Sequence, residues 1–371
     1  MSRITPQRQG EPPSHVEPFQ QSVDAARTAQ AALGDHLRRL REHEGPHTVA
    51  VTGATGFVGR HLVRALLGAG HRVRALVRDR EKAGRVLPKD ERLAVVEGEI
   101  LDGRSPAAVC AGADVAVHLI GIIREAPGGQ TFERMHVQAT EAIVSAARSA
   151  GVLRHLHMSA LGVQDNTGIA YLESKFEAER RVVDSGLAWT IFRPALIHGA
   201  DGEFTGMMRT WAEGRAFPFL FMPYFTRAEY VPGQAGVPRV VAPRVAPVHV
   251  DDVAAAFVGA IDNERAVGEI YNLAGPEELP FPEMLHAVRD ALPLANKSIR
   301  ARGIPGRAAA AKARVAAAVG LGGLLPFDEG MARMGERDVV ATLTKAERHL
   351  GWRPRPFRAS IREYAASIGR S

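Results

Sequence analysis

The sequence predicts an α/β protein built on a doubly wound parallel sheet. Three observations support this prediction. Apolar runs typical of buried strands alternate with segments of helical spacing from His47 to about residue 200. The first run, HTVAVT, is nearly continuous, as expected for a strand covered on both faces. A glycine-rich stretch lies directly between that run and the helical segment RHLVRALLGAG.

Further strands and helices follow this first pair in order. The strands HRVRALV, LAVVEGEI and ADVAVHLIG come next, and a helix is predicted over 131–151. The strand LRHLHMSA, a helix over 171–186 and the strand AWTIFRPALI complete the regular alternation. His155 and His157 alternate on LRHLHMSA, and we expect at least one of them to face a neighbouring element rather than a substrate.

The composition is that of a globular protein with an unevenly placed positive charge. The chain has 371 residues, 46% of them hydrophobic, and a formal net charge of +6. Residues 296–371 hold 15 Lys/Arg and 6 Asp/Glu, a net +9, which leaves −3 for the other residues. This basic end suits an acidic partner or an anionic lipid surface, or it is solvated surface charge. Because no aromatic residues are interleaved with the basic ones, we expect no nucleic-acid binding.

The cysteine content and the lack of targeting signals further restrict the classes of protein to which this chain could belong. The single cysteine, Cys110, excludes an internal disulfide and a cysteine-built metal site. The first residues lack the apolar core of a secretory signal, and no apolar window is long enough to span a bilayer. We therefore expect a cytoplasmic protein, and peripheral attachment to the inner face of a membrane stays open.

The glycine-rich stretch GATGFVG, from Gly53 to Gly59, predicts a dinucleotide site. Gly53 permits a tight turn, Gly56 lets the backbone approach a pyrophosphate, and Gly59 lets the helix pack closely on the strand. The helix N-terminus then offers free N–H groups and a partial positive charge to the phosphates. Such a triplet is weak evidence alone, but here it follows a buried strand and opens a helix.

The end of the second strand indicates which nicotinamide nucleotide is preferred. An acid at this place usually binds the ribose hydroxyls of NAD, whereas an arginine accommodates the 2′-phosphate of NADP. Here Val77 is followed by Arg78, with Arg74 and Arg80 nearby. We therefore predict NADP(H) as the preferred cofactor, and NAD(H) stays open because Asp79 is adjacent.

Ser159, Tyr171 and Lys175 form a candidate catalytic set. Tyr171 and Lys175 are four residues apart on a predicted helix and so share a face, and Ser159 ends the preceding strand. The Tyr171 hydroxyl would exchange a proton with a carbonyl or alcohol oxygen that Ser159 holds by a hydrogen bond. Because a free phenol has a pKa of about 10, we expect the ammonium of Lys175 to lower the pKa of Tyr171.

His249, Asp251 and Asp252 have the residue types of metal ligands. One histidine beside two acids at a strand–helix junction is more typical of a helix cap, with the acids on the first turn. We therefore predict no metal site in this chain.

An aromatic cluster in 201–247 has two interpretations. Its residues line a hydrophobic substrate or quinone site, or they form a local core for a smaller lobe, which is the interpretation we favour. The cluster consists of Phe217, Phe219, Phe221, Tyr224 and Phe225.

These motifs resemble the short-chain dehydrogenase/reductase superfamily in its extended or atypical form, the epimerase/dehydratase-like group. The likeness holds from about His47 to Ala291 and rests on TGATGFVG, HLIG, Ser159, YLESK, FRPALIHG, PVHVDDVA and YNLAGPE. SKFEAERRVVDSGLAWTIFRPALIHG, LAGPEELPFPEMLHAVRDAL and LGWRPRPF are similar to the group of the NADPH-binding accessory subunit of complex I and its bacterial relatives. The resemblance implies a Rossmann fold.

The resemblance also implies where a cofactor would lie. The amides of Phe57 and Val58 would face the pyrophosphate, Glu99 and Ile100 would flank the adenine, and Lys175 would also hold the nicotinamide ribose. The segments 118–121 and 193–197 would lie along the cofactor and at its nicotinamide end. The cofactor residues predicted in all are Gly53, Thr55, Gly56, Phe57, Val58, Gly59, Arg78, Glu99, Ile100, His118, Leu119, Gly121, Tyr171, Lys175, Arg193, Pro194, Ala195 and Ile197.

Two positions depart from the family pattern. Glu99 stands where an aspartate beside the adenine is usual, and its longer side chain still reaches this position in our interpretation. His136 stands in the helix after HLIG where an asparagine of the proton relay is frequent. The second departure puts an intact relay in doubt.

The chain is predicted to consist of five segments. Residues 1–46 are a disordered start followed by an amphipathic helix, 47–200 are the NADP(H)-binding Rossmann domain, and 201–247 are an insertion into the substrate lobe. Residues 248–275 return to the Rossmann sheet, and 276–371 complete the substrate lobe and the basic tail.

Two functions fit the sequence. The first is an NAD(P)H-dependent oxidoreductase, epimerase or dehydratase that acts on a small carbonyl, alcohol or quinone substrate through Ser159, Tyr171 and Lys175. The second is a largely non-catalytic accessory or assembly protein of respiratory complex I or of quinone metabolism, which NADPH stabilises. The N-terminal helix and the basic C-terminus, as membrane or complex contacts, favour the second function, and the retained catalytic set favours the first.

Overall fold

The computed structural model of this chain describes residues 46–152, 154–230, 238–321 and 325–368. The helix predicted within 1–46 lies outside the described residues.

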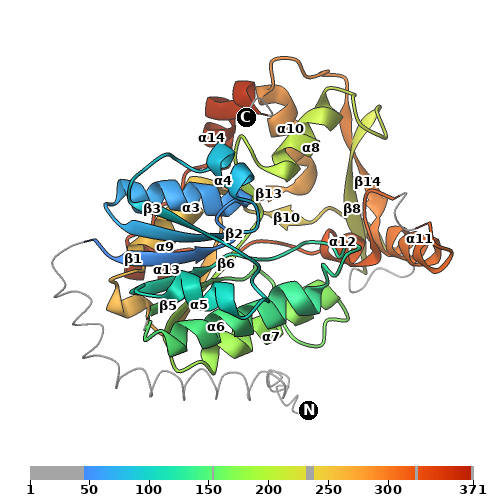
Figure 1. Cartoon of the computed structure of the whole chain (residues 1–371). Coiled ribbons are helices and arrows are strands. Elements are labelled where there is room, and N and C mark those ends of the chain that lie inside the picture. The colour runs from blue at the N-terminus through green and yellow to red at the C-terminus, as the bar shows by residue number, and fades with distance from the viewer. Residues whose placement is uncertain (1–45, 153, 231–237, 322–324, 369–371) are drawn as a thin grey trace, which may run out of the picture.

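A seven-stranded parallel sheet forms the centre of the molecule (Figure 1). Every neighbouring pair of its strands is parallel, so the predicted doubly wound α/β fold is confirmed. The strands are, in spatial order, β12 (Glu269–Leu273), β6 (Ala188–Pro194), β5 (Arg154–Met158), β4 (Val115–His118), β1 (Thr48–Thr52), β2 (Arg72–Val77) and β3 (Leu93–Glu97).

Helices cover both faces of this sheet. One face packs against α3 (Phe57–Gly68) and α9 (Val250–Gly259), and the other packs against α5 (Arg104–Cys110), α6 (Ala139–Ser149) and α7 (Ala170–Val183). In Figure 1, α3 lies above the sheet and α5, α6 and α7 lie below it. Because side chains alternate along a strand, Val49 and Val51 of β1 face α3, whereas Ala50 faces the α5–α7 layer.

The strand order changes direction beside β1. From β1 the chain builds β2 and β3 on one side, and it then crosses to build β4, β5 and β6 on the other side. In such sheets, ligands bind at the carboxyl ends of the strands next to this switch point. The candidate site is therefore expected where β1 and β4 end. The short helix α4 (Arg80–Val86) lies between β2 and β3 in the chain.

A second lobe packs at the carboxyl edge of the sheet (Figure 1). Its core joins α8 (Glu203–Ala212), α10 (Phe281–Ala291) and α14 (Phe357–Tyr364) through Met208, Met284, Leu285 and Phe357. A three-stranded sheet of β14 (Arg300–Pro305), β8 (Phe221–Glu229) and β9 (Arg239–Val241) carries α11 (Gly306–Ala318) and α12 (Glu329–Met334).

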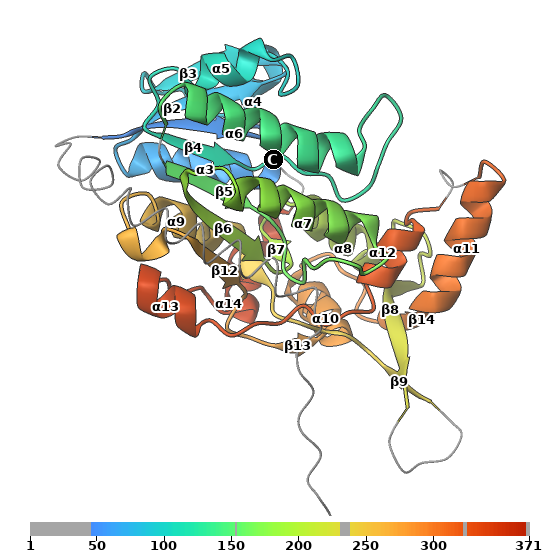
Figure 2. The same ribbon diagram turned by 90° about the horizontal axis from the view of Figure 1, so that it is seen from below.

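Smaller elements connect the two lobes. Seen from below, α13 (Thr344–Leu350) lies beside β12, the strand at one edge of the central sheet (Figure 2). The remaining elements are the strand pairs β7 (Ile197–His198) with β11 (Val248–His249) and β10 (Arg244–Val245) with β13 (Leu279–Pro280), a π-helical turn η1 (Glu133–Gln138), and the 3-10 turns η2 (Glu264–Ala266) and η4 (Ala365–Ser367). Among the described helices, none combines the length and hydropathy that crossing a bilayer requires.

Three local predictions need correction. The strand predicted for AWTIFRPALI is divided, because β6 ends at Pro194 and β7 leaves the central sheet to pair with β11. The helix predicted over 131–151 contains the π-helical turn η1 before α6 begins. The aromatic cluster is also divided, since Tyr224 and Phe225 pack in cores while Phe217 and Phe219 are 72% and 53% exposed.

Candidate active site

The glycine-rich turn follows β1 directly. Gly53 has a φ of +76°, and a Cβ on it would lie 3.1 Å from the carbonyl carbon of Leu119. The Gly56 N–H donates to the Gly53 carbonyl over 3.0 Å. A Cβ on Gly59 would lie 2.1 Å from the same carbonyl oxygen, so any side chain there would push α3 away from the turn.

The N-terminus of α3 is open to a ligand. Helix α3 begins at Phe57, and its N-cap Gly56 is extended and supplies no capping side chain. The first N–H groups of a helix have no partner within the helix, so those of Phe57 and Val58 point outward. No acidic residue lies in this first turn. The arrangement suits an anion such as a pyrophosphate.

Arg78 and Asp79 lie next to this turn, at the end of β2. Arg78 is exposed and forms no hydrogen bond or ion pair within the described part of the chain. The Asp79 carboxylate instead caps α4 and accepts a hydrogen bond from the Lys82 N–H over 2.8 Å. Arg74 and Arg80 donate to backbone carbonyls of neighbouring elements. Of these charged groups, Arg78 alone is left for a ligand.

Glu99 and Ile100 follow β3. Glu99 is exposed, whereas Ile100 is buried in the core under α5. The turn is held by Asp102, a residue the sequence did not indicate, which accepts from the Ser105 N–H over 2.7 Å. Hydrogen bonds from the Ser105 side chain and backbone lower the pKa of Asp102 to about 2. The Asp102 carboxylate is therefore ionised at neutral pH and keeps these hydrogen bonds.

The segment 118–121 crosses between the glycine-rich turn and the candidate lysine. His118 ends β4, and its Nδ1 lies 2.7 Å from the Thr52 hydroxyl of β1. A Cβ on Gly53 would lie 3.2 Å from the Ile120 nitrogen as well as close to Leu119. A Cβ on Gly121 would lie 2.8 Å from the Lys175 ammonium. The predicted nucleotide residues and the candidate catalytic residues are thus in one site.

Ser159 and Lys175 lie at the carboxyl end of β5, and Tyr171 is in the first turn of α7, the helix that also carries Lys175. Lys175 is 3% exposed and its Nζ donates to the Met158 carbonyl over 3.2 Å. Ser159 donates its N–H to Phe192 of β6 over 2.7 Å, and its buried hydroxyl has no hydrogen-bond partner among the described residues. That hydroxyl is available to a substrate oxygen. Burial lowers the pKa of Lys175 to about 8, and the charge of Glu179 opposes this shift.

The expected effect of Lys175 on Tyr171 is wrong for this structure. Burial raises the pKa of Tyr171 to about 12, because the phenolate would lose its hydration. The ring is surrounded edge-on by Phe132 and His136, with ring centroids 5.8 and 5.5 Å away. Tyr171 therefore holds its proton throughout the neutral range.

His136 lies in this site although it replaces the family's asparagine. The π-helical turn η1 presents it, and its Nδ1 lies 2.8 Å from the Ser174 hydroxyl. Its Nε2 lies 3.1 Å from the Ile122 N–H, so the ring holds the segment after Gly121. Burial lowers the pKa of His136 to about 3, which leaves the ring neutral.

The predicted residues 193–197 lie at the end of β6. The Arg193 Nε donates over 2.7 Å to the fully buried carboxylate of Glu179, one helical turn after Lys175. This ion pair, which the sequence did not indicate, ties β6 to α7. Pro194 accepts from the Leu161 N–H over 2.9 Å, Ala195 donates to Leu273 over 2.8 Å, and Ile197 pairs with Val248.

A short helix of the second lobe packs against Tyr171. Met334 of α12 packs in the apolar cluster that contains Tyr171, Ile169 and Leu172. Arg333 beside it donates to the carbonyls of Thr167, over 3.0 Å, and Gly168 in the loop before α7. The surroundings of Tyr171 are therefore apolar and include a residue from the C-terminal part of the chain.

His61 fastens α3 to the two lobes, and no sequence signal pointed to it. Its Nε2 lies 3.0 Å from Asp201, and its Nδ1 lies 2.5 Å from Asp251 at the start of α9. Burial acts against the charged ring, but the hydrogen bonds to both carboxylates raise the pKa of His61 above its ordinary value. Arg60 also pairs with Asp201 over 2.6 Å.

The helix-cap interpretation of His249, Asp251 and Asp252 is confirmed. The His249 Nδ1 accepts from the Asp251 N–H over 3.2 Å at the start of α9. Asp252 accepts from the Arg355 guanidinium over 2.7 Å. Within the described ranges, no group of three or more His, Cys, Asp or Glu side chains could hold a metal ion.

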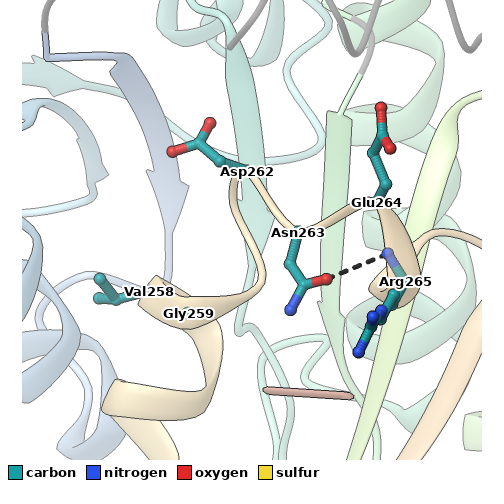
Figure 3. A pocket seen from close by; sticks show the side chains of 6 residues that line it. All are labelled: Val258, Gly259, Asp262, Asn263, Glu264 and Arg265. Carbon is teal, nitrogen blue, oxygen red and sulfur yellow. Dashed lines mark hydrogen bonds between the residues drawn. The ribbon is translucent and has the colours of Figure 1, made fainter. Parts of the chain in front are cut away.

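A pocket of about 510 Å³ lies elsewhere, between the end of α9 and η2 (Figure 3). Asp262 in its lining pairs over 2.6 Å with His47, which precedes β1, so the pocket is at the amino ends of the strands. The candidate site is at the opposite edge. The lining residues are Val258, Gly259, Asp262, Asn263, Glu264 and Arg265.

Comparison with known proteins agrees with this geometry. Residues 53–217 match the model of a family described as NAD(P)H-binding. This segment is therefore similar to NAD(P)H-binding domains. The matched segment spans the glycine-rich turn and all three candidate catalytic residues.

The chain is similar to several named proteins, and a reductase is among them. The chain is 34% identical over 213 residues to a ceramide reductase of Caulobacter vibrioides, covering 57% of this chain and 59% of that protein. It is 29% identical over 244 residues to the mitochondrial NADH dehydrogenase (ubiquinone) 1 alpha subcomplex subunit 9 of Arabidopsis thaliana, covering 65% and 56%. The chain thus spans less than 60% of the length of either relative. Both agree with the resemblance drawn from the motifs.

A solved structure shows the same fold. The UDP-glucuronic acid 4-epimerase of Bacillus cereus superposes with a TM-score of 0.62 over 86% of this chain and 98% of that chain, at 18% identity. The Rossmann-type fold expected from the motifs is confirmed.

Proposed function

We propose that this protein is an NADPH-dependent reductase that converts an apolar ketone or quinone to the corresponding alcohol or quinol. The observation that carries the proposal is the free, buried hydroxyl of Ser159 next to Tyr171 and Lys175, at the edge where the glycine-rich turn opens. A ceramide reductase among the relatives supports the reductive direction and an apolar substrate.

The residues of the site fit a nicotinamide dinucleotide. The turn has no room for a side chain at Gly53 or Gly59, and the start of α3 has no capping side chain. Backbone groups alone therefore face the ligand here, and we call the segment from Gly53 to Gly59 the cradle. Bound there, NADPH would supply the hydride to the substrate carbon. The free Arg78 favours NADPH over NADH, because Asp79 is engaged as a helix cap and does not bind a ribose.

The proton chemistry follows from the three side chains. Ser159 donates a hydrogen bond to the carbonyl oxygen and holds it as negative charge develops. The oxygen, once alkoxide-like, is more basic than a phenolate, so it takes the proton of Tyr171 even though the pKa of that group is about 12. A tyrosine that holds its proton is suited to reduction, whereas oxidation would need a phenolate base. Lys175 then returns a proton to the Tyr171 oxygen.

Tyr171→Phe tests this function. The purified protein should oxidise NADPH in the presence of one or more members of a panel of apolar ketones and quinones. The variant should lose roughly 100-fold or more in rate while it binds NADPH as before, because the proton donor is gone and the cradle is unchanged. The exposed Tyr230→Phe is the matched control and should keep the full rate. An undiminished rate in Tyr171→Phe would overturn the proposal.

An accessory role at a membrane complex is the second candidate. A complex I subunit is among the relatives, and helix α11 with the residues that follow it exposes Val315 (64%), Val319 (63%) and Leu321 (52%) near basic residues. In this interpretation the protein is cytoplasmic and attaches to the inner face of a membrane through α11. Val315→Asp combined with Val319→Asp should then shift the protein from the membrane fraction to the supernatant. Unchanged fractionation of this variant would argue against the role.

A further inference from the structure

A row of buried histidines runs down the sheet from the candidate site. His155 and His157 are two residues apart on β5 and face the α5–α7 layer. His118 is the register partner of His157 on β4, and Trp189 is the register partner of His155 on β6. Ring centroids are 5.5 Å apart between His118 and His157 and 6.2 Å apart between His157 and His155.

This row concentrates polar atoms that have no partner. Seven buried atoms on it make no hydrogen bond with any described residue: His118 Nε2, both ring nitrogens of His155 and of His157, Ser159 Oγ and Trp189 Nε1. An unpaired buried polar group costs about 1–3 kcal/mol, and natural proteins keep few of them. Their gathering on one sheet face next to the candidate site indicates a use other than stability.

The charged and titratable groups around the row are few. Lys175 of α7 lies at Met158, between His157 and Ser159 along β5, and Glu179 lies one turn further, paired with Arg193. His136 of η1 adds a neutral ring. Burial, together with the neighbouring rings and Lys175, keeps the pKa of His118 and His157 well below the ordinary value.

Neutral imidazole has the property that a proton path needs. One ring nitrogen accepts a proton while the other releases one, so the ring can pass a proton without a lasting charge. His157 and His155 have both nitrogens free for this purpose. Water is a suitable link between such rings, since a buried water needs two to four polar partners.

We propose that His157, with His118 and His155 and the water between them, forms an internal path that returns protons to Lys175. The inference rests on the proposed reductase function. In each turnover the substrate carbon gains a hydride, the substrate oxygen gains the Tyr171 proton, and the phenolate takes a proton from Lys175. The neutral amine of Lys175 then takes a proton from the path, and solvent replaces it. No electrons pass through the histidines.

Two substitutions at His157 test the path. His157→Leu is apolar, and His157→Gln keeps hydrogen bonding but does not relay protons. Both should bind NADPH as the parent does and lower the maximal rate of NADPH oxidation by roughly ten-fold or more, with KM for NADPH unchanged. The solvent deuterium isotope effect on the maximal rate should rise, because proton supply becomes limiting. A purely structural histidine would not raise it.

His71→Leu is the matched control. His71 is also buried and stacks on His47, but it precedes β2 at the far end of the sheet. This variant should keep the parent rate and isotope effect. Parent-like values in both His157 variants would overturn the path.

A high-resolution crystal structure of the unmodified protein provides a test that needs no substrate or variant. Ordered water should lie within hydrogen-bond distance of the ring nitrogens of His155 and His157, and a dry row would overturn the inference. If the unmodified protein oxidises no NADPH with any carbonyl, the reductase function fails, and the relay fails with it. A working parent enzyme with unaffected His157 variants would reject the relay alone.

Discussion

Along β5, buried polar groups on the two faces of the central sheet differ in how far they are hydrogen-bonded. On the α3–α9 face, Arg154 is fully buried and donates to the carbonyls of Ala188 and Ala260 and to the Thr190 hydroxyl, at 2.6 to 2.7 Å. On the α5–α7 face, the next residue, His155, has no partner for either nitrogen in the described structure. Two adjacent residues of β5 therefore differ. The Arg154 guanidinium is hydrogen-bonded, whereas the His155 ring has no hydrogen-bond partner among the described residues.

This difference distinguishes buried polar side chains that stabilise the fold from those that lower its stability. Burial lowers the pKa of Arg154 to about 9, yet its donors remain paired, so the side chain joins β5 to β6 and to the end of α9. His155 and His157 make no such connection within the described structure. We infer that the α3–α9 face stabilises the fold, whereas the α5–α7 face near β5 gives up stability for chemistry.

The largest expected effect comes from Arg154→Met. The substitution leaves several buried carbonyls and a hydroxyl without their donor, so we expect a loss of about 3 kcal/mol in the free energy of unfolding, measured with urea. His155→Leu next to it is the matched control and should raise the free energy of unfolding by about 1 kcal/mol or more, because it removes two buried ring nitrogens that have no partner in the described structure. Equal losses in the two variants would remove the difference between the faces.

Gly59→Ala should have the next largest effect, because it separates α3 from the glycine-rich turn. The new Cβ would meet the Gly53 carbonyl at 2.1 Å, so we expect a loss of about 2 kcal/mol in stability and weaker NADPH binding. Urea unfolding and nucleotide fluorescence measure the two effects. Gly68→Ala at the other end of α3 meets no atom within 4 Å and should stabilise by up to about 1 kcal/mol. Unchanged NADPH affinity in Gly59→Ala would contradict the assigned cradle.

The smallest effect concerns His61→Gln and depends on pH. Since the pKa of His61 is raised in the folded protein, its contribution to stability is complete below about pH 6.5 and is lost as pH rises through the folded pKa. The variant should therefore be less stable than the parent at pH 5.5 and nearly equal to it at pH 9. Thermal unfolding at both values measures this. If the stability difference between the parent and the variant grew with pH, His61 would be neutral rather than protonated in the folded protein, contrary to this assignment.

The fold and the phosphate cradle were predictable because their signals are local. The alternation of apolar runs with helical segments, and Gly53, Gly56 and Gly59 at one strand–helix joint, are read within a few residues of one another. The same is true of the turn that places Arg78 after β2. Short helices such as α4 and α5 carried no such signal, and neither did the break between β6 and β7.

The other contacts of the site could not be predicted from the sequence, because the residues that form them are far apart in the chain. His61 meets Asp251 across 190 positions, and Arg154 meets Ala260 across 106. The raised pKa of Tyr171 depends on burial by η1 and α12, which no spacing near Tyr171 indicates. Ser159, Tyr171 and Lys175 stay a prediction, which rests on a helix spacing and a strand end that place them near one another.

The hydrogen bonds from Arg333 to the loop before Tyr171 affect how the sequence of this protein can change in evolution. Under the proposed function, the surroundings of the reacting end of the substrate come partly from α12, some 165 positions after that loop. Sequence changes confined to this distant helix would alter which substrates are accepted while the nucleotide-binding half stays the same. Divergence of α12 would therefore change the specificity without changing the proposed hydride-transfer site.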